Sequence, residues 1–408
     1  MKVAFISHYA ALYGANRSLL NLIEGLKKYD VEPYIIIPER GEIIDRLQEI
    51  EVEFAVIPFE WWIGCGLSKN NGLKLIYQIP RYLCHAVIRL LKNILSLLSF
   101  TQQLKAWDID IIYSNSSVIP IGAFAAKKLG LPHVWHLREF IDLDYNFHLD
   151  WGRSVFNYFL NRTEFKIAIS QAIHSYFIPE SSYESSAIVY NGVASQDLFD
   201  RYRQQKKGLS NCDQNYTFVL VGVIHPNKGQ QIAIEALSLL TKDFPQIRLL
   251  IVGGEEKAIP TLKELTQQLN VADKVEFWGY ISDPYEAYMQ ADAALMCSVN
   301  EGMGRVTVEA MSACCPVIGY DNGGTSEIIC HEHTGLLYTG QSQALAACMK
   351  RFLENPQWAK QLGENAWKEA RDKYSIESYA KEIYRILTIT HKPNFDTEYI
   401  EKQAYSKV

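Results

Sequence analysis

The chain has 408 residues, which is longer than one hydrophobic core usually supports, and this length predicts two domains. A formal net charge of −6 makes nucleic acid an unexpected partner. Eight cysteines without paired spacing, with Cys314 and Cys315 adjacent, indicate reduced thiols, and the apolar run after Met1 is too short for a secretory signal, so a cytoplasmic location is predicted.

The first half of the chain alternates short apolar runs with amphipathic segments. Strands are predicted over residues 3–7, 32–37, 53–56, 111–114, 133–136, 165–169 and 188–190, and helices over residues 16–29, 41–48 and 118–129. Such alternation is typical of a parallel sheet wrapped by helices.

A basic segment, residues 73–100, interrupts this alternation. No acidic residue occurs from Trp61 to Trp107, whereas six basic residues do: Lys69, Lys74, Arg81, Arg89, Lys92 and Lys105. An apolar stripe recurs at helical spacing, with Arg81, His85, Arg89, Lys92 and Ser96 on the other side; the stripe comprises Leu83, Val87, Leu90, Ile94 and Leu97, widened by Leu91 and Leu98. The charges argue against a membrane span. Two interpretations remain, a helix lying on an anionic membrane surface or a core-facing helix with a solvated cationic face, and Trp61 and Trp62 could be interfacial anchors or core.

The second half repeats the strand–helix pattern. Strands are predicted over residues 218–221, 249–252, 275–277, 293–297 and 316–318, and helices over residues 230–240, 257–269, 284–290, 306–313, 325–329 and 343–354. The polar stretch 200–215 is interpreted as a linker. The predicted organisation is therefore an N-terminal domain over 1–199, a C-terminal domain over 216–373, and final helices over 374–408 that return to the first domain.

The most informative stretch runs from Glu301 to Ala310, between a predicted buried strand and a helix of small residues. Glycines at 302 and 304 allow a ligand to approach the backbone, and the helix N-terminus favours an anion. Arg305 falls in the first turn of the predicted helix, where a cation interacts unfavourably with the helix dipole. A phosphate bound next to Arg305 would explain a cation at this position. The pattern predicts a sugar nucleotide with a diphosphate at this turn, Glu301 on the sugar and Glu309 on the ribose.

This spacing of Glu301 and Glu309, together with Gly302, Met303, Gly304 and Arg305, resembles the E-x7-E signature of retaining GT-B glycosyltransferases of family 4. The resemblance covers nearly the whole chain and implies an α/β protein with two doubly wound, Rossmann-like domains facing an interdomain cleft. Ligands of such sheets gather at the carboxyl ends of the strands.

The resemblance extends to several positions in the first domain. Gly14 resembles one glycine of the family's phosphate-approaching loop, although the usual second glycine is missing. Arg17 could add charge there or be an exposed residue at a helix start. His136 resembles the family's histidine beside the donor sugar and reacting centre, and a neutral imidazole there could hydrogen-bond a sugar hydroxyl. Arg138 and Glu139 are candidates for the acceptor pocket, with a local salt bridge as the alternative.

In the second domain, Lys228 matches the lysine that the family places on the donor diphosphate. Val223 stands where the family normally has an arginine, a departure that removes one cation from the diphosphate clamp. Arg305, Arg17 or His225 could compensate; otherwise the donor is unusual or the reaction slow. Tyr280 lies in the loop after the predicted strand 275–277. This strand and loop resemble those whose backbone holds the nucleobase in the family.

The resemblance implies transfer of a sugar from a nucleotide sugar donor to a sugar or lipid-linked acceptor, with retention and without a cofactor or metal. Asp108 and Asp110, like Asp142 and Asp144, imitate a metal-binding D-x-D, but two carboxylates without a preorganised site hold a metal poorly. The basic segment suggests an anionic membrane surface on the inner face of the cell membrane and a role in polysaccharide or glycolipid assembly. The alternatives are a degenerate donor-binding protein without turnover, and a GT-B-like epimerase or phosphorylase.

Overall fold

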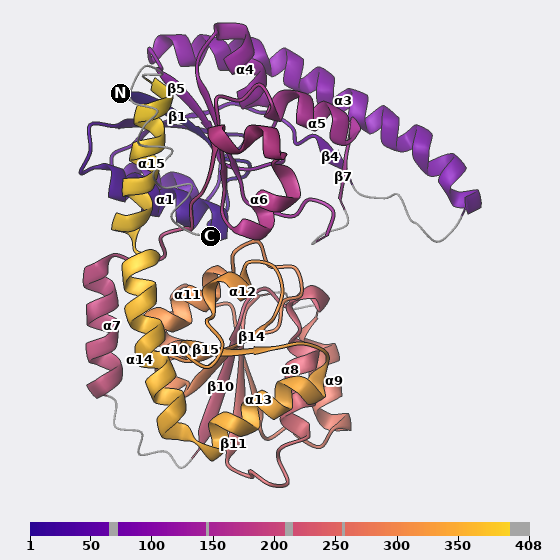
Figure 1. The fold of residues 1–408 in the computed structure, drawn as a ribbon. Coiled ribbons are helices and arrows are strands. Elements are labelled where there is room, and N and C mark those ends of the chain that lie inside the picture. The colour runs from indigo at the N-terminus through magenta and orange to yellow at the C-terminus, as the bar shows by residue number, and fades with distance from the viewer. Residues whose placement is uncertain (65–71, 144–146, 209–214, 255–257, 392–408) are drawn as a thin grey trace. The chain divides into compact units, whose positions relative to one another are not determined.

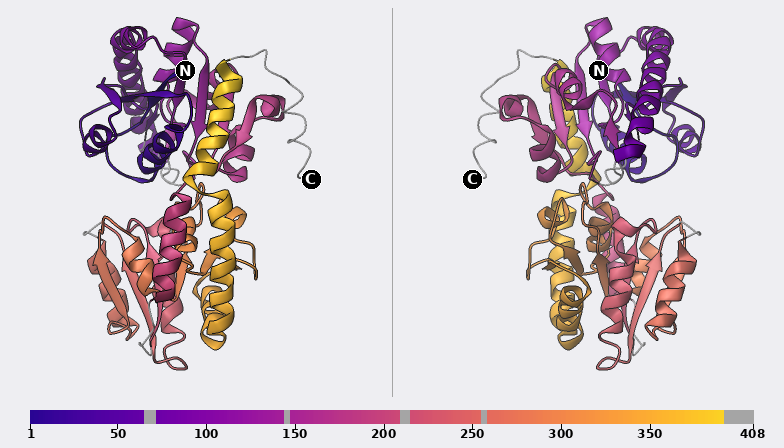
Figure 2. Two further views of the ribbon diagram at one scale, coloured as in Figure 1. Left: turned by 90° about the vertical axis from the view of Figure 1, so that its left-hand side faces the viewer. Right: turned by 90° about the vertical axis from the view of Figure 1, so that its right-hand side faces the viewer.

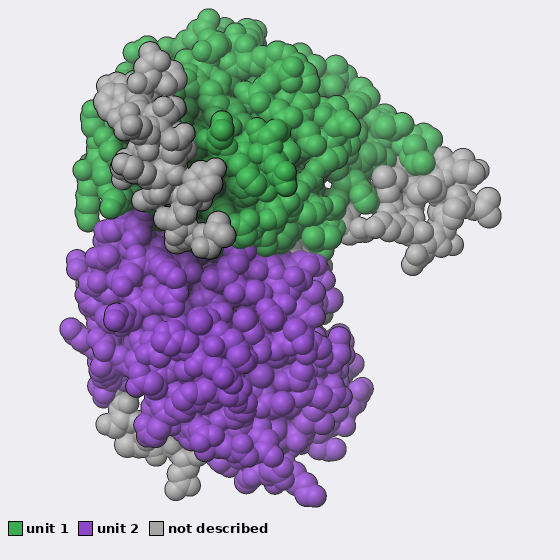
Figure 3. Space-filling model, in the orientation of Figure 1, with its two compact units in different colours: residues 1–190, 379–408 green, residues 191–378 purple. Residues whose placement is uncertain are grey.

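The computed structural model describes residues 1–64, 72–143, 147–208, 215–254 and 258–391, with the backbone alone for residues 72–78. The chain divides into two compact units, coloured green and purple in Figure 3. Unit 1 comprises Met1–Tyr190 and Tyr379–Val408, and unit 2 comprises Asn191–Ser378. Each unit is an α/β body built on a parallel sheet, as the sequence predicts.

The sheet of unit 1 has seven strands in the order β3-β2-β1-β5-β6-β8-β9, all parallel. The strands are β1 (Lys2–Ile6), β2 (Glu32–Ile37), β3 (Glu53–Val56), β5 (Ile111–Ser114), β6 (His133–Leu137), β8 (Phe165–Ala168) and β9 (Ser186–Ile188). A separate antiparallel pair joins β4 (Ile63–Gly64) to β7 (His148–Leu149). The carboxyl ends of the long strands meet at one edge of the sheet, where ligands of this architecture bind.

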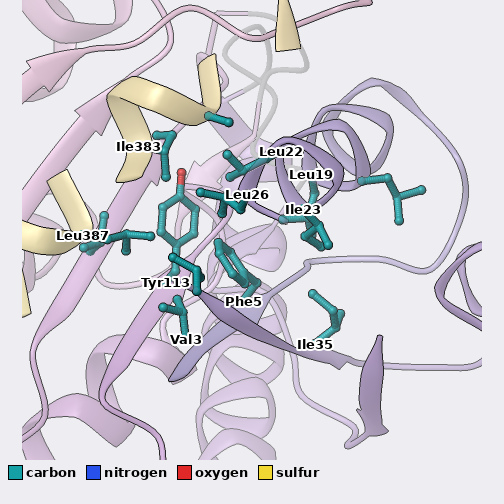
Figure 4. Packing of buried hydrophobic residues seen from close by; sticks show 14 of the residues in the cluster. Val3, Phe5, Leu19, Leu22, Ile23, Leu26, Ile35, Tyr113, Ile383 and Leu387 are labelled. Carbon is teal, nitrogen blue, oxygen red and sulfur yellow. The ribbon is translucent and has the colours of Figure 1, made fainter. Parts of the chain in front are cut away.

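Helices cover both faces of the unit 1 sheet (Figure 1). They are α1 (Gly14–Leu26), α2 (Ile43–Glu49), α3 (Gly72–Ala106), α4 (Ile121–Leu129), α5 (Gly152–Leu160), α6 (Gln171–Phe177), the 3-10 turn η1 (Glu180–Ser185) and α15 (Ile376–His391). One core packs α1, α2 and α15 on the sheet, and Figure 4 shows Tyr113 of β5 among Leu26, Ile383 and Leu387. On the other face, Trp135 of β6 packs against Trp62 and against α5.

The sheet of unit 2 has six parallel strands in the order β12-β11-β10-β13-β14-β15. They are β10 (Tyr216–Val221), β11 (Ile247–Val252), β12 (Val275–Gly279), β13 (Ala293–Met296), β14 (Val317–Tyr320) and β15 (Gly335–Tyr338). The helices are α7 (Gln196–Gly208), η2 (Pro226–Lys228), α8 (Gln230–Ser238), α9 (Ile259–Gln268), α10 (Tyr285–Gln290), α11 (Arg305–Ser312), α12 (Thr325–Ile328), α13 (Ser342–Glu354) and α14 (Pro356–Lys373). They lie on both faces of the sheet (Figures 1 and 2).

The structure divides the chain differently from the predicted boundaries in three places. Unit 1 ends at Tyr190 rather than at residue 199, and the final part of the chain rejoins it at Tyr379 rather than at residue 374. The predicted linker over 200–215 is helical as far as residue 208, because α7 packs on α14 within unit 2. There, Asp200 accepts two hydrogen bonds from Arg371 at 2.9 Å. A polar sequence therefore concealed a helix held by ion pairs, and the remaining linker residues 209–214 lie outside the described residues.

In helix α3, the predicted apolar stripe faces away from the core of unit 1. The buried face of the helix carries Ala86, Asn93, Phe100 and Leu104, whereas most of the predicted stripe is solvent-exposed. Eight apolar side chains of α3 are exposed: Ile79, Leu83, Val87, Ile88, Leu91, Ile94, Leu95 and Leu98. The core-facing interpretation of the stripe is wrong.

Two of the predicted surface cations of α3 are engaged within unit 1. Arg89 pairs with the buried Asp150 at 2.5 Å, and Lys92 pairs with Glu60 at 2.5 Å. These counter-charges come from distant parts of the chain, so the helical pattern alone gave no sign of them. Lys69 lies outside the described residues, as does the side chain of Lys74.

The charges were also a poor reason to exclude a membrane span. By length and composition, the segment Ile79–Ala106 could cross a membrane, because an 18-residue window within it has a mean hydropathy of 1.5. Among the described residues, no other helix meets this criterion. However, a single helix of this kind is weak evidence for a span, and one of its faces is committed to unit 1 through Asn93 and Phe100.

Candidate donor and acceptor sites

The unit 2 site centres on the turn between β13 and α11. Gly304 caps α11 with a φ of +82°, a left-handed conformation that favours glycine, and the helix begins at Arg305. The first backbone N–H groups of a helix have no partners within the helix and carry the positive end of its dipole. Sequence analysis therefore placed both the turn and the helix start correctly, and the turn offers an anion-binding position.

Both carboxylates of the motif are paired with a cation of the same unit. Lys228 Nζ donates to Glu301 Oε2 at 2.8 Å, and Arg305 Nε donates to Glu309 Oε1 at 2.8 Å. The Glu309 side chain is only 5% exposed, whereas those of Lys228 and Glu301 are 28% and 19% exposed. The Lys228–Glu301 pair is thus the more accessible of the two, and Arg305 is bound to Glu309 rather than free to replace the missing arginine.

Two buried hydroxyls surround Gly304. A methyl group added to Gly304 would lie 3.2 Å from Thr307 Oγ1 and 3.6 Å from Thr325 Oγ1. Neither hydroxyl has a hydrogen-bond partner in the part of the chain that the structure describes. Unpaired buried hydroxyls are costly, and a ligand oxygen that reached this position would satisfy them.

The loop after β14 holds this turn in place. Gly324 N–H donates to Glu301 O at 2.8 Å, and a methyl group on Gly324 would lie 2.5 Å from Gly302 O. A methyl group on Gly323 would lie 2.6 Å from Glu301 O, so both adjacent glycines of the loop after β14 are needed for this close approach. Met303 is buried, and its sulfur accepts from Asn191 N–H at 3.1 Å, so its side chain supports the turn from the protein interior.

Two further predicted positions lie at the carboxyl edge of the same sheet. Tyr280, directly after β12, is 64% exposed. Val223, directly after β10, is 49% exposed, and Gln230 Nε2 donates to its carbonyl at 3.0 Å. An exposed apolar side chain therefore occupies the place of the family's arginine.

The unit 1 site is organised by Arg138, which follows β6 and is buried. Its Nε donates to Asn115 Oδ1 at 2.9 Å, and its terminal nitrogen donates to Tyr379 Oη at 2.9 Å and contacts His136 Nδ1 at 3.2 Å. Arg138 is thus held by partners from β6, from the end of β5 and from α15. None of these three contacts involves Glu139.

His136 is fully buried, and its ring has one unused nitrogen. Tyr113 Oη lies 2.6 Å from Nδ1. An arginine N–H can only donate, so Nδ1 is the acceptor and the neutral ring carries its hydrogen on Nε2. Burial, aided by the nearby Arg138 charge, lowers the pKa of His136 well below 6.5, which keeps the ring neutral. Nε2, the donor of the neutral ring, is buried and has no hydrogen-bond partner among the described residues.

Glu139 lies beside this network and binds the loop after β5. Its Oε1 accepts from Ser117 N–H at 3.1 Å and also from the Ser116 hydroxyl. Burial raises the pKa of Glu139, while the hydrogen bond from Ser116 and the charge of Arg138 oppose that rise. Glu139 therefore shapes the loop after β5 and faces the same edge as Arg138.

The loop after β1 is held by Asn16, a residue that sequence analysis did not single out. Asn16 Nδ2 donates to Tyr9 O at 2.9 Å and Ala11 O at 2.8 Å. A methyl group on Gly14 would meet nothing within 4 Å, so Gly14 leaves open space at the start of α1. Arg17 donates to Leu12 O at 3.0 Å and thereby supports this loop.

Asp108 and Asp110 do not lie at this edge. Asp110 Oδ2 accepts from Lys2 N–H at 2.8 Å, and Asp108 lies 4.0 Å from Lys2 Nζ, so both hold the entry of β1. Their contacts agree with the structural interpretation of this D-x-D pattern. Asp144 lies outside the described residues.

The family models match most of the chain. Residues 13–197 match the model described as Glycosyltransferase Family 4, and residues 201–369 match Glycosyl transferases group 1. With the two parallel-sheet units and the E-x7-E turn, these matches define the class: the chain belongs to the family 4, group 1 glycosyltransferases of the GT-B fold.

Among related proteins, EpsD of Bacillus subtilis (strain 168), named as a glycosyltransferase, is 32% identical over 168 residues, which are 41% of this chain and 43% of EpsD. This match therefore spans less than half of EpsD. The alpha-monoglucosyldiacylglycerol synthase of Acholeplasma laidlawii is 22% identical over 394 residues, 91% of each chain.

Solved structures share the fold over nearly the whole length. Anabaena Alr3699/HepE in complex with UDP superposes with a TM-score of 0.76 and 22% identity, covering 95% of this chain and 100% of that one. At this identity the likeness shows the fold alone. The same Anabaena protein has also been crystallised with UDP-glucose, with a TM-score of 0.74.

Proposed function

We propose that this glycosyltransferase is a retaining enzyme that moves a sugar from a nucleoside diphosphate sugar to an acceptor hydroxyl. The observation that carries the proposal is the α11 turn, where two unpartnered buried hydroxyls surround Gly304 and Lys228 lies against Glu301. A diphosphate would satisfy the hydroxyls, the helix N–H groups and the lysine together. The UDP complexes of the Anabaena structural neighbour support the same class of donor.

In the proposed reaction, unit 2 stabilises the departing diphosphate. Lys228 and the N-terminus of α11 oppose the charge that develops on it, a contribution of the kind that dominates many enzymatic rate enhancements. Glu301 orients the sugar once Lys228 turns to phosphate, and Glu309 binds the ribose. The leaving phosphate accepts the acceptor proton, and the acceptor attacks on the face from which the phosphate departs. No metal is needed in this scheme, and turnover should be insensitive to EDTA.

In unit 1, we propose that His136 donates from Nε2 to a sugar hydroxyl. Arg138 and Glu139 are proposed to shape the acceptor side. The fixed orientation of His136, held through Tyr113 and Arg138, is the kind of positioning that lowers the entropic cost of reaction.

The test is a transfer assay with a panel of UDP-, GDP- and ADP-sugars and a bacterial lipid extract, followed by product analysis. Wild-type protein should release nucleoside diphosphate and form an α-configured product from an α-configured donor. Glu301→Ala should abolish transfer, and Lys350→Ala, a change at an exposed lysine of α13, should not. An inverted product would refute retention.

The same assay separates the two alternatives. A degenerate donor-binding protein would bind nucleotide without releasing transferred sugar, and an epimerase would convert the donor without an acceptor. The exposed Val223 at the diphosphate edge is the observation that favours the degenerate protein. Glu301 and Lys228, the residues that match the family's donor site, are both present and lie against each other, which favours the transferase.

We propose further that the enzyme is cytoplasmic and binds the inner face of the cell membrane through α3, in polysaccharide or glycolipid assembly. Eight exposed apolar side chains gather on one helix that carries no acidic residue. Exposed apolar faces of this size mark interaction sites, and an apolar face flanked by Arg81 and Lys92 suits an anionic lipid surface.

Vesicle co-sedimentation tests this membrane face. Because Arg89 and Lys92 are engaged with Asp150 and Glu60, apolar residues are the better targets for mutation. Leu91→Glu together with Leu95→Glu should abolish binding to vesicles that contain phosphatidylglycerol. Leu239→Glu, a change at an exposed leucine of unit 2, is the matched control. Equal binding of all three proteins would refute the membrane face.

A further inference from the structure

Unit 1 contains an apolar cavity that the donor and acceptor residues do not use. It has a volume of about 240 Å³ and is bordered by α3, α4 and α5. Its walls are mainly aromatic and aliphatic: Trp61, Trp62, Leu90, Pro120, Phe124, Trp151, Val155 and Phe159. It is larger than the roughly 150 Å³ apolar cavity that stays dry and takes up benzene.

The polar side chains at the cavity are already satisfied. Arg89 makes a bidentate pair with Asp150, at 2.8 Å and 2.5 Å. Asn93 accepts from Glu60 N–H at 2.8 Å and donates to Glu60 O at 2.9 Å. A sugar or a nucleotide needs polar partners in its site, and an ordered water needs two to four of them. These side chains leave such ligands little to bind, so the cavity suits an apolar occupant.

The indole N–H groups of Trp61 and Trp62 are also satisfied. Trp61 Nε1 donates to His8 O at 2.7 Å, and Trp62 Nε1 donates to Ser117 O at 3.0 Å. Both rings therefore present carbon surface to the cavity. Three of the eight tryptophans of the chain line it, which makes its occupation measurable by fluorescence.

The cavity continues into the exposed apolar face of α3. Leu90 forms part of its wall and is itself partly exposed. Val87 and Ile94, both exposed, lie one helical turn to either side of Leu90. On the opposite wall, Val155 is 36% exposed. An apolar chain could therefore pass from the α3 face into the cavity along apolar surface throughout.

We infer that this cavity binds the hydrocarbon chain of a membrane lipid. The inference rests on the proposed function in one respect, because the acceptor of the proposed transfer is one of the two sources of the chain, the other being a lipid of the bilayer. Chain binding itself requires neither nucleotide nor turnover. A failure of chain binding would therefore leave the transferase proposal intact. Likewise, a failure of sugar transfer would leave the binding of a hydrocarbon chain intact.

The test is quenching of tryptophan fluorescence by dodecanoic acid brominated at its terminal carbon, with unbrominated fatty acids as competitors. Wild-type protein should show saturable quenching. Competitors should bind about fourfold tighter for each added methylene, as expected for burial of a methylene group, until the cavity is full.

Val155→Phe should fill the cavity and weaken the brominated acid at least tenfold, and Leu239→Phe is the matched control. Should Val155→Phe unfold, Val155→Ala serves instead, because a larger cavity should move the limiting chain length upward. Quenching that is absent, independent of chain length, or equal in the wild-type and Val155→Phe proteins would overturn the inference. The last result would leave an apolar segment of a protein partner as the remaining occupant.

Two sources of the chain are distinguishable with the same variant. If bilayer lipid fills the cavity, Val155→Phe should weaken vesicle binding. If the acceptor fills it, vesicle binding should be unchanged, and KM should rise for a chain-bearing acceptor while kcat is retained. Either outcome supports a hydrocarbon site.

Discussion

The carboxyl edges of the two sheets are built in different ways. In unit 2, the turn, the helix start and both carboxylates fall within residues 301–309, and two cation–carboxylate pairs hold them. In unit 1, Arg138 binds Asn115, which follows another strand, and Tyr379, which lies 241 residues after Arg138 in the chain. Unit 2 carries a local ligand-binding motif, whereas unit 1 carries a buried network assembled by the fold.

This difference teaches where function and stability are coupled. Removing Lys228 from unit 2 should mainly affect ligand binding, because its partner Glu301 is partly exposed and can be solvated. Removing a unit 1 side chain leaves buried groups without partners, which costs stability as well. The predictions below test this contrast.

The largest expected effect is acid destabilisation confined to unit 1. Burial lowers the pKa of His8 and of His133 from 6.5 to about 3, and lowers that of His136 well below 6.5. The folded state keeps these rings neutral while the unfolded chain takes up protons. Their stabilisation is therefore present above pH 6.5 and is lost as the pH falls below it.

At pH 5.5 each of these histidines should cost about 1.4 kcal/mol, or about 4 kcal/mol together. Glu139, with its raised pKa, works in the opposite direction and offsets part of this loss. Hydrogen exchange at pH 7.5 and 5.5 should show β1, β5 and β6 losing protection before β10 and β13. Earlier loss in unit 2 would break the contrast.

Lys228→Ala should reduce turnover about 10²- to 10³-fold, as expected for a group that opposes charge in the transition state. Its stability should change little, because Glu301 can be solvated once unpaired. Steady-state kinetics with the preferred donor and thermal unfolding of the same protein measure the two effects. A strongly destabilised variant would mean that this pair is structural.

Tyr379→Phe should do the reverse. It removes the hydroxyl that accepts from Arg138 and should cost about 1.5 kcal/mol of folding stability, as for a buried hydrogen bond to a charged group. UDP affinity should stay the same, since the change lies in unit 1. Urea unfolding and UDP titration together check this, with Tyr29→Phe as the control, a tyrosine after α1 whose ring stacks on Tyr384 of α15.

The smallest effect is expected for Thr307→Val. Loss of one hydroxyl beside Gly304 should weaken UDP binding by about 1 kcal/mol, roughly fivefold. The folded protein should be no less stable, because the hydroxyl is already unpartnered without ligand. Calorimetric titration of UDP measures the first effect, and unchanged affinity would show that the hydroxyl does not contact the donor.

The same contrast explains what the sequence could predict. The strand–turn–helix at Glu301 was readable because its parts are adjacent in the chain, and the alternation of strands and helices identified both sheets. By contrast, Arg89 points into unit 1 because it pairs with Asp150, and Arg138 donates to Tyr379 of the last helix. Helical periodicity carries no information on such distant partners. Asn115 and Ser116, polar residues directly after a predicted strand, were the available signal for the unit 1 network.

The central claim is that unit 2 binds a nucleoside diphosphate at the α11 turn. The most direct measurement is thermal stabilisation of wild-type, Glu309→Ala and Lys350→Ala proteins by UDP, GDP and ADP. At 100 times its dissociation constant, the correct nucleotide should stabilise the wild-type and Lys350→Ala proteins by about 2.7 kcal/mol, and the Glu309→Ala protein far less. Stabilisation by none of the three nucleotides, or equal stabilisation of the Glu309→Ala protein, would contradict the claim.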